Sequence, residues 1–554
     1  MVRLFAKIYD AIAIIASVTI FASVPAYAGT AVYSTDFSDV PKEHWAYSSV
    51  YQMRNMGITD GVGGGLFGLN EPVTRAQFAA FLCRLYRWET TSAGVSTFND
   101  IRPSDWHFGF IEAAARHGTF IENSGNFRPD APITRSEMAV MLVRSLGFGE
   151  LAGQLTSSGF IDVFENSGYI ALARDFGIIH GIDATRFAPN DTATRGHAAV
   201  MMMRMHSRQS SDIDFLNGFY AIRSADQMDY IPMLNSTCFG WSRFEMGSGS
   251  IVLNMTPANG NEFSLPVGYE RPLEMANTAL LMIAVKNEQI NGINLTDFII
   301  SNETSRSHAI NLIVDAIEKH PFDGVAIDFE EMRGESLKNN FTEFLSKLRV
   351  QIPDKLLYVA VHPVPRPGLP YFDAYDYAAI GNLADKVILM AHDYHTKRMT
   401  EQEMAMNFTI TPLSPIDQVY YSLKAVTDEN TGVKDRGKIV LQFSFEVVQW
   451  QSREGRVLNA TPYTPTYDAL VARMQSDGEI NYSTRYESPY VTYTTDDGTH
   501  NTIWYEDARS VDAKIRLSKM FDINGFSLWR LGTVPEYHQE GFYLDVWSVV
   551  NARR

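Results

Sequence analysis

Apolar residues follow two different patterns along the chain of 554 residues. Up to about residue 206 they recur at helical spacing, as in Phe78, Phe81, Leu82 and Leu85. After a polar stretch near residues 207–214, short apolar runs alternate with amphipathic segments. The runs are GFYAI, ALLMIAV, GVAIDF, LLYVAVH, KVILMAH, KIVLQFSF and GFSLWRL. The two patterns predict a helical N-terminal part, a linker and a C-terminal α/β domain with parallel strands.

The strand–helix alternation over residues 215–554 favours a barrel in which each parallel strand is followed by a helix. A doubly wound open sheet is the alternative. It is disfavoured because no glycine-rich phosphate loop follows the first predicted strand and because the candidate functional residues end strands. We therefore expect an α/β protein, with a (β/α)8 TIM-type barrel preceded by an α-helical module of three repeats.

The N-terminal part repeats one helix–loop–helix pattern three times, at intervals of about sixty residues. A glycine that follows each first helix suits the left-handed conformation at a helix end. A threonine precedes each second helix as an expected N-cap, and Gln77 and Glu137 complete a capping box in the first two repeats. The recurring residues are Asp39, Asp100 and Asp162; Gly57, Gly118 and Gly177; Thr74, Thr134 and Thr194; and Arg75, Arg135 and Arg195.

These segments resemble S-layer homology repeats. Their expected boundaries are residues 36–86, 98–148 and 160–206. The resemblance implies that the repeats pack around a pseudo-threefold axis and bind acidic secondary cell-wall polysaccharide in the grooves. Arg75, Arg135 and Arg195 are the matching candidates, because a guanidinium at a helix start can form a bidentate pair with a carboxylate. The alternative is that these arginines only join the repeats together.

The aromatic positions differ among the repeats. Trp45 and Trp106 are equivalent residues of the first two repeats and are further candidates for binding the wall polymer. Glu165 takes that position in the third repeat. We therefore expect the groove of the third repeat to bind weakly or not at all.

The first 28 residues have the parts of an export signal. Arg3 and Lys7 form the basic end, AIAIIASVTIFASV the apolar stretch, and Ala26-Tyr27-Ala28 the cleavage site. We expect residues 1–28 to be removed, although Asp10 leaves an uncleaved anchor as the alternative. We find no other apolar run long enough to span a membrane, so the expected location is outside the cell, at the cell wall or surface of a bacterium.

Composition and charge limit the classes of function that this protein can have. The hydrophobic content of 45% and the charged content of 20% are typical of a globular protein. The formal net charge of −17 argues against a nucleic-acid partner, which requires a basic surface. Only Cys83 and Cys238 are present, in separate predicted domains, so we expect packing rather than a disulfide to stabilise the fold.

The run FDGVAIDFEEM, which begins at Phe322, ends a predicted strand in acids. Alternate residues of a strand share a face, so Ala326, Asp328 and Glu330 should point one way and the intervening apolar residues the other. A strand with one apolar face and carboxylates at its end suits an active site at a barrel mouth. The alternative is that the two acids are only salt-bridge partners.

The segment DGVAIDFE resembles the signature of glycoside hydrolase family 18, the chitinase-like enzymes, which reads Asp-Gly-x-Asp-x-Asp-x-Glu. The match implies that Glu330 is the proton donor and that Asp328 orients the acetamide group of the substrate. Asp323 opens the motif, and Ala326 stands where the middle acid is expected. Without that acid, Asp328 is expected to stay ionised.

Two later segments extend the resemblance. LMAHDYH is similar to a sixth-strand element and supplies Met390, His392 and Asp393 as sugar-site candidates, with His392 in place of a tyrosine. IWYEDARSVDAKIRLSKMFDINGFSLWRLG resembles the end of the spore-cortex and germination N-acetylglucosaminidase branch, with Trp529 as the floor of the sugar pocket. Tyr220, at the first strand, is a further candidate.

The resemblance implies a cell-wall-anchored glycosidase that cleaves β-1,4 bonds of an N-acetylglucosamine-containing polymer, peptidoglycan or chitin. In that family the N-acetyl oxygen of the substrate is the nucleophile, and catalysis is retaining. The main alternative is a non-catalytic carbohydrate-binding surface protein, which Ala326 and His392 would favour. A structural S-layer component is a third possibility.

No cofactor is expected, and no metal. His362, His392 and His395 lie near strand ends, but the chain has neither an HExxH motif nor cysteine-rich spacing around them.

Overall fold

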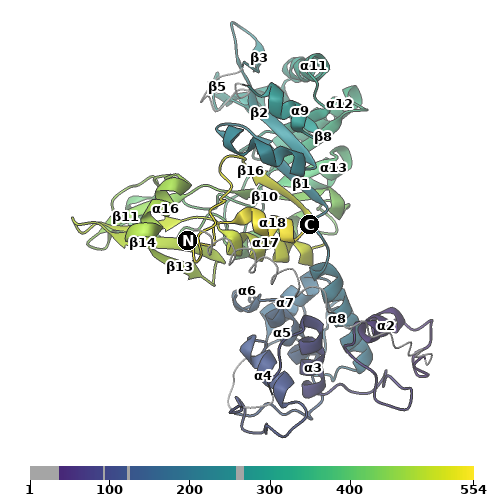
Figure 1. The fold of residues 1–554 in the computed structure, drawn as a ribbon. Coiled ribbons are helices and arrows are strands. Elements are labelled where there is room, and N and C mark those ends of the chain that lie inside the picture. Colours follow the sequence, from purple (N-terminus) through teal and green to yellow (C-terminus); the bar gives the residue numbers. More distant parts are fainter. Residues whose placement is uncertain (1–35, 92–93, 121–124, 257–267) are drawn as a thin grey trace, which may run out of the picture.

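The computed structural model describes residues 36–91, 94–120, 125–256 and 268–554. Figure 1 shows a helical module (purple to blue) beneath a barrel, with an antiparallel sheet projecting to one side. Among those residues no helix combines the length and the apolar content that crossing a membrane requires. The export signal expected at residues 1–28 lies outside the described residues.

The N-terminal module has the predicted helix pairs. Its helices are α2 (Tyr47–Asn55), α3 (Arg75–Tyr86), α4 (Phe108–Arg116), α5 (Arg135–Ser145), α6 (Gly149–Gly153), α7 (Ser167–Asp175) and α8 (Arg195–Gln209). The predicted capping boxes are confirmed: the N–H groups of Gln77 and Glu137 donate to the hydroxyls of Thr74 and Thr134 at 3.2 and 3.1 Å. In the third repeat His197, three residues after Thr194, takes the same place. The glycines after α2, α4 and α7 have φ values of 71°, 63° and 64°, as expected for helix ends.

The three repeats close on one another in a ring. Helix α3 packs on α4, α5 on α7, and α8 on α2. Each helix-opening arginine reaches into the next repeat, where its Nε donates to a phenylalanine carbonyl and its guanidinium lies over the same ring. These pairs are Arg75 with Phe127, Arg135 with Phe187, and Arg195 with Phe67, at 2.7, 2.9 and 2.8 Å. The ring has the pseudo-threefold arrangement that the resemblance implies.

The C-terminal domain contains a closed barrel of eight parallel strands, as predicted. The strands in order are β1 (Phe215–Tyr220), β2 (Ser236–Met246), β4 (Ala279–Val285), β7 (Gly324–Asp328), β8 (Leu356–Val361), β9 (Lys386–Leu389), β10 (Ile439–Ser444) and β16 (Gly525–Trp529). Strand β1 pairs with both β16 and β2 and so closes the barrel. Strand β2 is absent from the runs predicted above, because its polar residues and its irregular register between Phe239 and Ser242 hide the pattern.

Helices cover the outside of the barrel. They are α10 (Leu295–Ser301), α11 (Glu303–Lys319), α12 (Glu335–Gln351), α13 (Tyr377–Leu383), α15 (Ile416–Val426), α17 (Ala508–Met520) and α18 (Val546–Ala552). Smaller elements are η1 (Ser224–Met233), β3 (Ile251–Asn254), α9 (Glu270–Met275), β5 (Gln289–Ile290), β6 (Ile293–Asn294), α14 (Glu401–Ala405) and η2 (Arg436–Lys438). The barrel interior holds its own cluster, including Ala326, Met282 and Tyr358. The other face of β7 packs into the layer beneath the helices, which confirms the predicted alternation.

An antiparallel sheet that the sequence did not predict is inserted between β10 and β16. Its strands are β11 (Val448–Arg453), β12 (Arg456–Val457), β13 (Glu479–Ser483), β14 (Ser488–Thr494) and β15 (His500–Trp504), and α16 (Tyr467–Ser476) belongs to the same insertion. The insertion stands beside the barrel mouth, because it follows the C-terminal end of β10.

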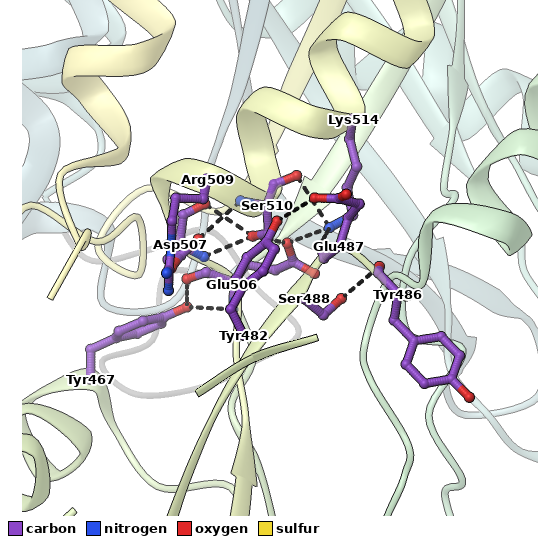
Figure 2. A network of polar contacts seen from close by, with 10 residues as sticks. All are labelled: Tyr467, Tyr482, Tyr486, Glu487, Ser488, Glu506, Asp507, Arg509, Ser510 and Lys514. Atoms are coloured by element: carbon purple, nitrogen blue, oxygen red, sulfur yellow. Dashed lines mark hydrogen bonds and ion pairs between the residues drawn. The ribbon is translucent and has the colours of Figure 1, made fainter. Parts of the chain in front are cut away.

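A buried polar network joins the insertion to α17 (Figure 2). Lys514 Nζ lies 2.7 Å from Glu506 Oε2, and both side chains are only 1% exposed. The hydroxyl of Ser510 donates to the same oxygen at 2.6 Å, and Tyr467 donates to the carbonyl of Glu506 at 2.9 Å. Glu506 is therefore a structural ion-pair partner that fixes the insertion in place.

The helical module docks directly on the barrel. Asp175 Oδ2 accepts hydrogen bonds from Tyr420 of α15 and Lys424 at 2.5 and 2.7 Å. Phe176 meets Phe521 edge to face. The expected linker near residues 207–214 is also fixed to the barrel. Helix α8 continues to Gln209, and the hydroxyl of Ser211 donates to Asn524 at 2.7 Å. The two domains therefore share a packed interface.

Candidate active site

The fourth barrel strand brings two carboxylic acids to the mouth. Asp328 ends β7 and is 8% exposed, whereas Glu330, two residues later, is exposed to solvent. Both line a cavity of about 380 Å³. Asp297, Glu331 and Arg243 are other residues of its wall. The parallel strands end together here, as in other barrels of this kind.

Burial raises the pKa of Asp328. Its Oδ1 is buried and has no hydrogen-bond partner in the part of the chain that the structure describes. The residue below it on the same face of β7 is Ala326, which offers no polar group. Burial therefore opposes the ionised state expected of Asp328, because no described residue hydrogen-bonds its Oδ1 to offset the loss of hydration of the anion.

The pKa of Glu330 is also raised, first by burial of the carboxyl among protein atoms and then by the charge of Asp328. The positive charge of His392 opposes the shift without cancelling it. A carboxylic acid that keeps its proton near neutral pH while open to a cavity has the properties of a proton donor.

The sixth strand contributes a polar cluster after β9. Met390 is 7% exposed and belongs to the barrel interior. His392 Nε2 lies 2.8 Å from Gln442 Oε1, and its Nδ1 lies 3.0 Å from Asp393 Oδ2. Burial alone would lower the pKa of His392, but the charge of Asp393 and these two contacts outweigh burial and raise it. His392 and Asp393 thus form an ion pair at the mouth.

Trp529 ends the last strand at the same mouth. It is partly exposed and contacts Phe219 edge to face, with ring centroids 5.1 Å apart. It lines a second cavity of about 710 Å³, between the barrel and the insertion, together with Glu446 and Arg530. The ring therefore borders this second cavity, and its role as the floor of a sugar pocket stays a prediction.

Two predicted site residues lie elsewhere. Tyr220 is 2% exposed and packs against Phe239 in the layer outside the barrel, because Phe219 takes the inward position on β1. Asp323 precedes β7, where its carboxylate accepts the N–H of Ala279 at 2.8 Å. At about 3.3 Å per residue it is roughly 16 Å from Asp328 along the strand. The structure does not bring either residue to the mouth.

Sequence reasoning missed two polar residues, one in the seventh strand and one just after it. Gln442 contacts His392, and Glu446 lines the larger cavity, as Trp529 does. A signal was present in KIVLQFSFE: Val440, Gln442 and Glu446 share one strand face, and only the first is apolar. The alternation that identified the acids of β7 could have identified these residues too.

The structure separates the candidate wall-polymer ligands into two groups. Trp45 and Trp106 are 57% and 59% exposed, although Trp45 stacks on His197. Arg135 and Arg195 are 8% and 3% exposed and hold the repeats together. Arg75 lines a groove of about 640 Å³ but pairs with Glu137 at 2.7 Å. The geometry shows the joining role of the arginines; polymer binding by these residues stays a prediction.

Comparison with known proteins identifies both parts of the chain. The model of glycosyl hydrolases family 18 matches residues 289–533, and the S-layer homology domain model matches residues 36–79, 97–139 and 161–199. The chain carries three S-layer homology repeats followed by a family 18 glycosyl hydrolase domain.

Relatives exist for each part. A cortical fragment-lytic enzyme of Bacillus subtilis is 25% identical over 290 residues, which are 50% of this chain and 62% of that enzyme. A cell surface protein of Thermoanaerobacter kivui is 30% identical over 176 residues, which are 31% of this chain and 21% of that protein. The chain spans roughly half to three fifths of the length of the relatives that match its barrel. Among solved structures, a Bacillus cereus spore cortex-lytic enzyme has 20% identity and a TM-score of 0.47, covering 61% of this chain and 74% of that one.

Proposed function

We propose that this protein is a cell-wall-anchored glycosidase that cleaves β-1,4 bonds of an N-acetylglucosamine-containing polymer. The observation that carries the proposal is the state of Glu330: exposed in a cavity at the barrel mouth, beside buried Asp328, with a raised pKa. General acid catalysis requires a donor that is both protonated and accessible.

The proposed mechanism is substrate-assisted and retaining. The carbonyl oxygen of the substrate's N-acetyl group attacks the anomeric carbon, while Glu330 gives its proton to the leaving glycosidic oxygen. Glu330, now a carboxylate, then takes a proton from the water that opens the cyclic oxazolinium intermediate. Because the anomeric carbon is attacked twice, from opposite faces in turn, its configuration is retained.

Asp328 has a second role in this mechanism. Its carboxylate would accept the N–H of the acetamide group and stabilise the positive charge of the intermediate. The unpartnered Oδ1 of the free site supports this role, because the ligand would supply the donor that the described residues do not. Trp529 would pack against the sugar ring, and Asp393 would bind its hydroxyl groups.

The substrate is proposed to be peptidoglycan rather than chitin. The relatives that match the barrel include enzymes named as cortical fragment-lytic, and the repeats support a position at a bacterial cell wall. The wall partner would be an acidic secondary polysaccharide, bound through the grooves next to Trp45 and Trp106. Both indoles are exposed enough to stack on sugar rings.

Incubation of the whole protein with purified peptidoglycan and with chitin tests the proposal. The whole protein is required because the two domains share an interface. Release of reducing ends is measured for the wild type, Glu330→Gln and a control, Glu335→Gln, whose exposed carboxylate pairs with Lys338 outside the cavity. We expect Glu330→Gln to lose about 10²–10⁴-fold in rate and the control to lose none. Glycan binding without release by the wild type would instead support the non-catalytic carbohydrate-binding protein.

A further inference from the structure

Three potential metal ligands converge beside the catalytic acids. Asp393 and His395 follow β9, Glu446 follows β10, and these strands are hydrogen-bonded neighbours. One coordinating atom of each side chain lies within 4.8 Å of those of the other two. A metal ion held at about 2.1 Å from each ligand keeps the ligand atoms roughly 3–4 Å apart. A small movement of the exposed Glu446 would close the difference.

The hydrogen bonding of this cluster is incomplete. His395 is only 5% exposed, and its Nδ1 has no hydrogen-bond partner among residues 36–91, 94–120, 125–256 and 268–554. The same holds for Asp393 Oδ1, which is also buried. A buried imidazole nitrogen and a buried carboxylate oxygen that lack partners are unfavourable unless a further group binds them.

The second oxygen of Asp393 has an orienting partner. Asp393 Oδ2 lies 3.0 Å from Nδ1 of His392, which in turn contacts Gln442. This ion pair engages Oδ2 and leaves Oδ1 over. Fixed ligands with such outer partners are typical of metal sites in proteins.

We propose that Asp393, His395 and Glu446 form a binding site for a divalent transition-metal ion such as Zn²⁺. One imidazole nitrogen and two carboxylates are ligands that suit this ion, whereas Mg²⁺ and Ca²⁺ prefer oxygen alone. Three protein ligands leave further coordination positions for water. Of the three histidines considered from the sequence, only His395 belongs to this site.

Positive side chains nearby do not block the cation. His392, Lys397 and Arg530 bring positive charge near the carboxylates, and His392 already pairs with Oδ2 of Asp393. Lys397 is exposed, so its flexible side chain can turn into solvent when an ion binds. Arg530 is directed in part to the carbonyl of Ile222, to which its Nε donates at 2.7 Å.

Metal binding has a consequence that rests on the proposed function. Asp393 is the proposed ligand of the sugar hydroxyls, and the ion would occupy its Oδ1. Zn²⁺ and the glycan therefore compete for one side of the mouth, and the ion is an inhibitor rather than a cofactor.

Titration of the EDTA-treated, dialysed whole protein with Zn²⁺ by calorimetry tests the site, with Co²⁺ absorption as a second probe. We expect one equivalent to bind to the wild type and the affinity to fall at least about tenfold in His395→Ala and in Glu446→Gln. The control is His538→Ala, which removes a 78% exposed histidine next to Asp545 and should change nothing. If His395→Ala does not fold, the Zn²⁺ affinity of Glu446→Gln tests the site alone. Glu446 is exposed, so its substitution should not disturb folding.

Absence of saturable binding by the wild type, or unchanged binding by both site variants, would overturn the proposal. Binding of a soluble peptidoglycan fragment is then measured with and without Zn²⁺, and we expect weaker glycan binding with the ion. Stoichiometric Zn²⁺ binding in a protein that binds no glycan would leave the metal site standing and count against the proposed function. Equal glycan affinity with and without bound Zn²⁺ would disprove the competition.

Discussion

The backbone N–H of Glu331 donates to Nε2 of His362 at 3.2 Å, across two adjacent barrel strands. Glu331 directly follows the proposed proton donor and has a φ of 61°, a conformation that non-glycine residues seldom adopt. Burial lowers the pKa of His362 to about 4, so this nitrogen keeps its lone pair at neutral pH. The hydroxyl of Tyr375 supports the same turn by donating to the carbonyl of Phe329 at 2.7 Å. The loop after β8 thus positions Glu330.

We predict that His362→Ala lowers kcat by about 10–100-fold with little change in KM, because a misplaced acid affects the reaction more than binding. His362→Gln keeps an acceptor and should recover part of the loss. Steady-state kinetics on peptidoglycan fragments measure both. A proportional rise in KM, or no difference between the two variants, would show that His362 does not position the acid.

The pH dependence follows from the raised pKa of Glu330. A general acid must be protonated, so activity is present below this pKa and is lost as pH rises through it. Removing the charge of Asp328 removes one cause of the shift, so in Asp328→Asn the Glu330 carboxyl should titrate about one to two pH units lower. Carbon NMR of labelled glutamate reports this titration even if the variant is inactive. An unchanged titration would exclude charge coupling between the two acids.

The buried ion pair between Glu506 and Lys514 gives a stability prediction. Lys514→Met leaves a carboxylate buried without its counter-charge, which costs about 3–5 kcal/mol in the free energy of unfolding. The control is Lys319→Met, which removes an exposed pair with Asp315 and should cost less than about 1 kcal/mol. Thermal and urea unfolding measure the two variants. Equal stability of both would mean that the insertion is not held by this contact.

Substitutions in the repeats should distinguish the residues that join the repeats from those that bind the wall polymer. Arg195→Ala removes a buried guanidinium that donates to Phe67 and Thr59, and should destabilise the module by about 2–3 kcal/mol. Trp45→Ala together with Trp106→Ala should leave unfolding unchanged and weaken sedimentation with purified wall polysaccharide. Undiminished sedimentation of the tryptophan double variant would remove both residues from the candidate binding surface.

The sequence allowed much of this architecture to be predicted, for reasons that are local. Capping by Thr74 and the alternation along β7 depend only on neighbouring residues, and both are confirmed. Tyr220 was misplaced because GFYAI is apolar on both faces, so its pattern does not tell which face points inward. Contacts between strands, such as that of His362 with Glu331, depend on closure of the barrel and leave no mark in either segment alone.

Asp175 binds Tyr420 and Lys424 and so fixes the repeats directly to the barrel. In the proposed function, this attachment limits how far from its anchoring point on the wall the barrel can act. A hydrolase mounted without a tether reaches only the glycan strands that pass next to its own attachment point. The area of wall that is digested would then depend on the surface density of the anchored molecules and not on the reaction time.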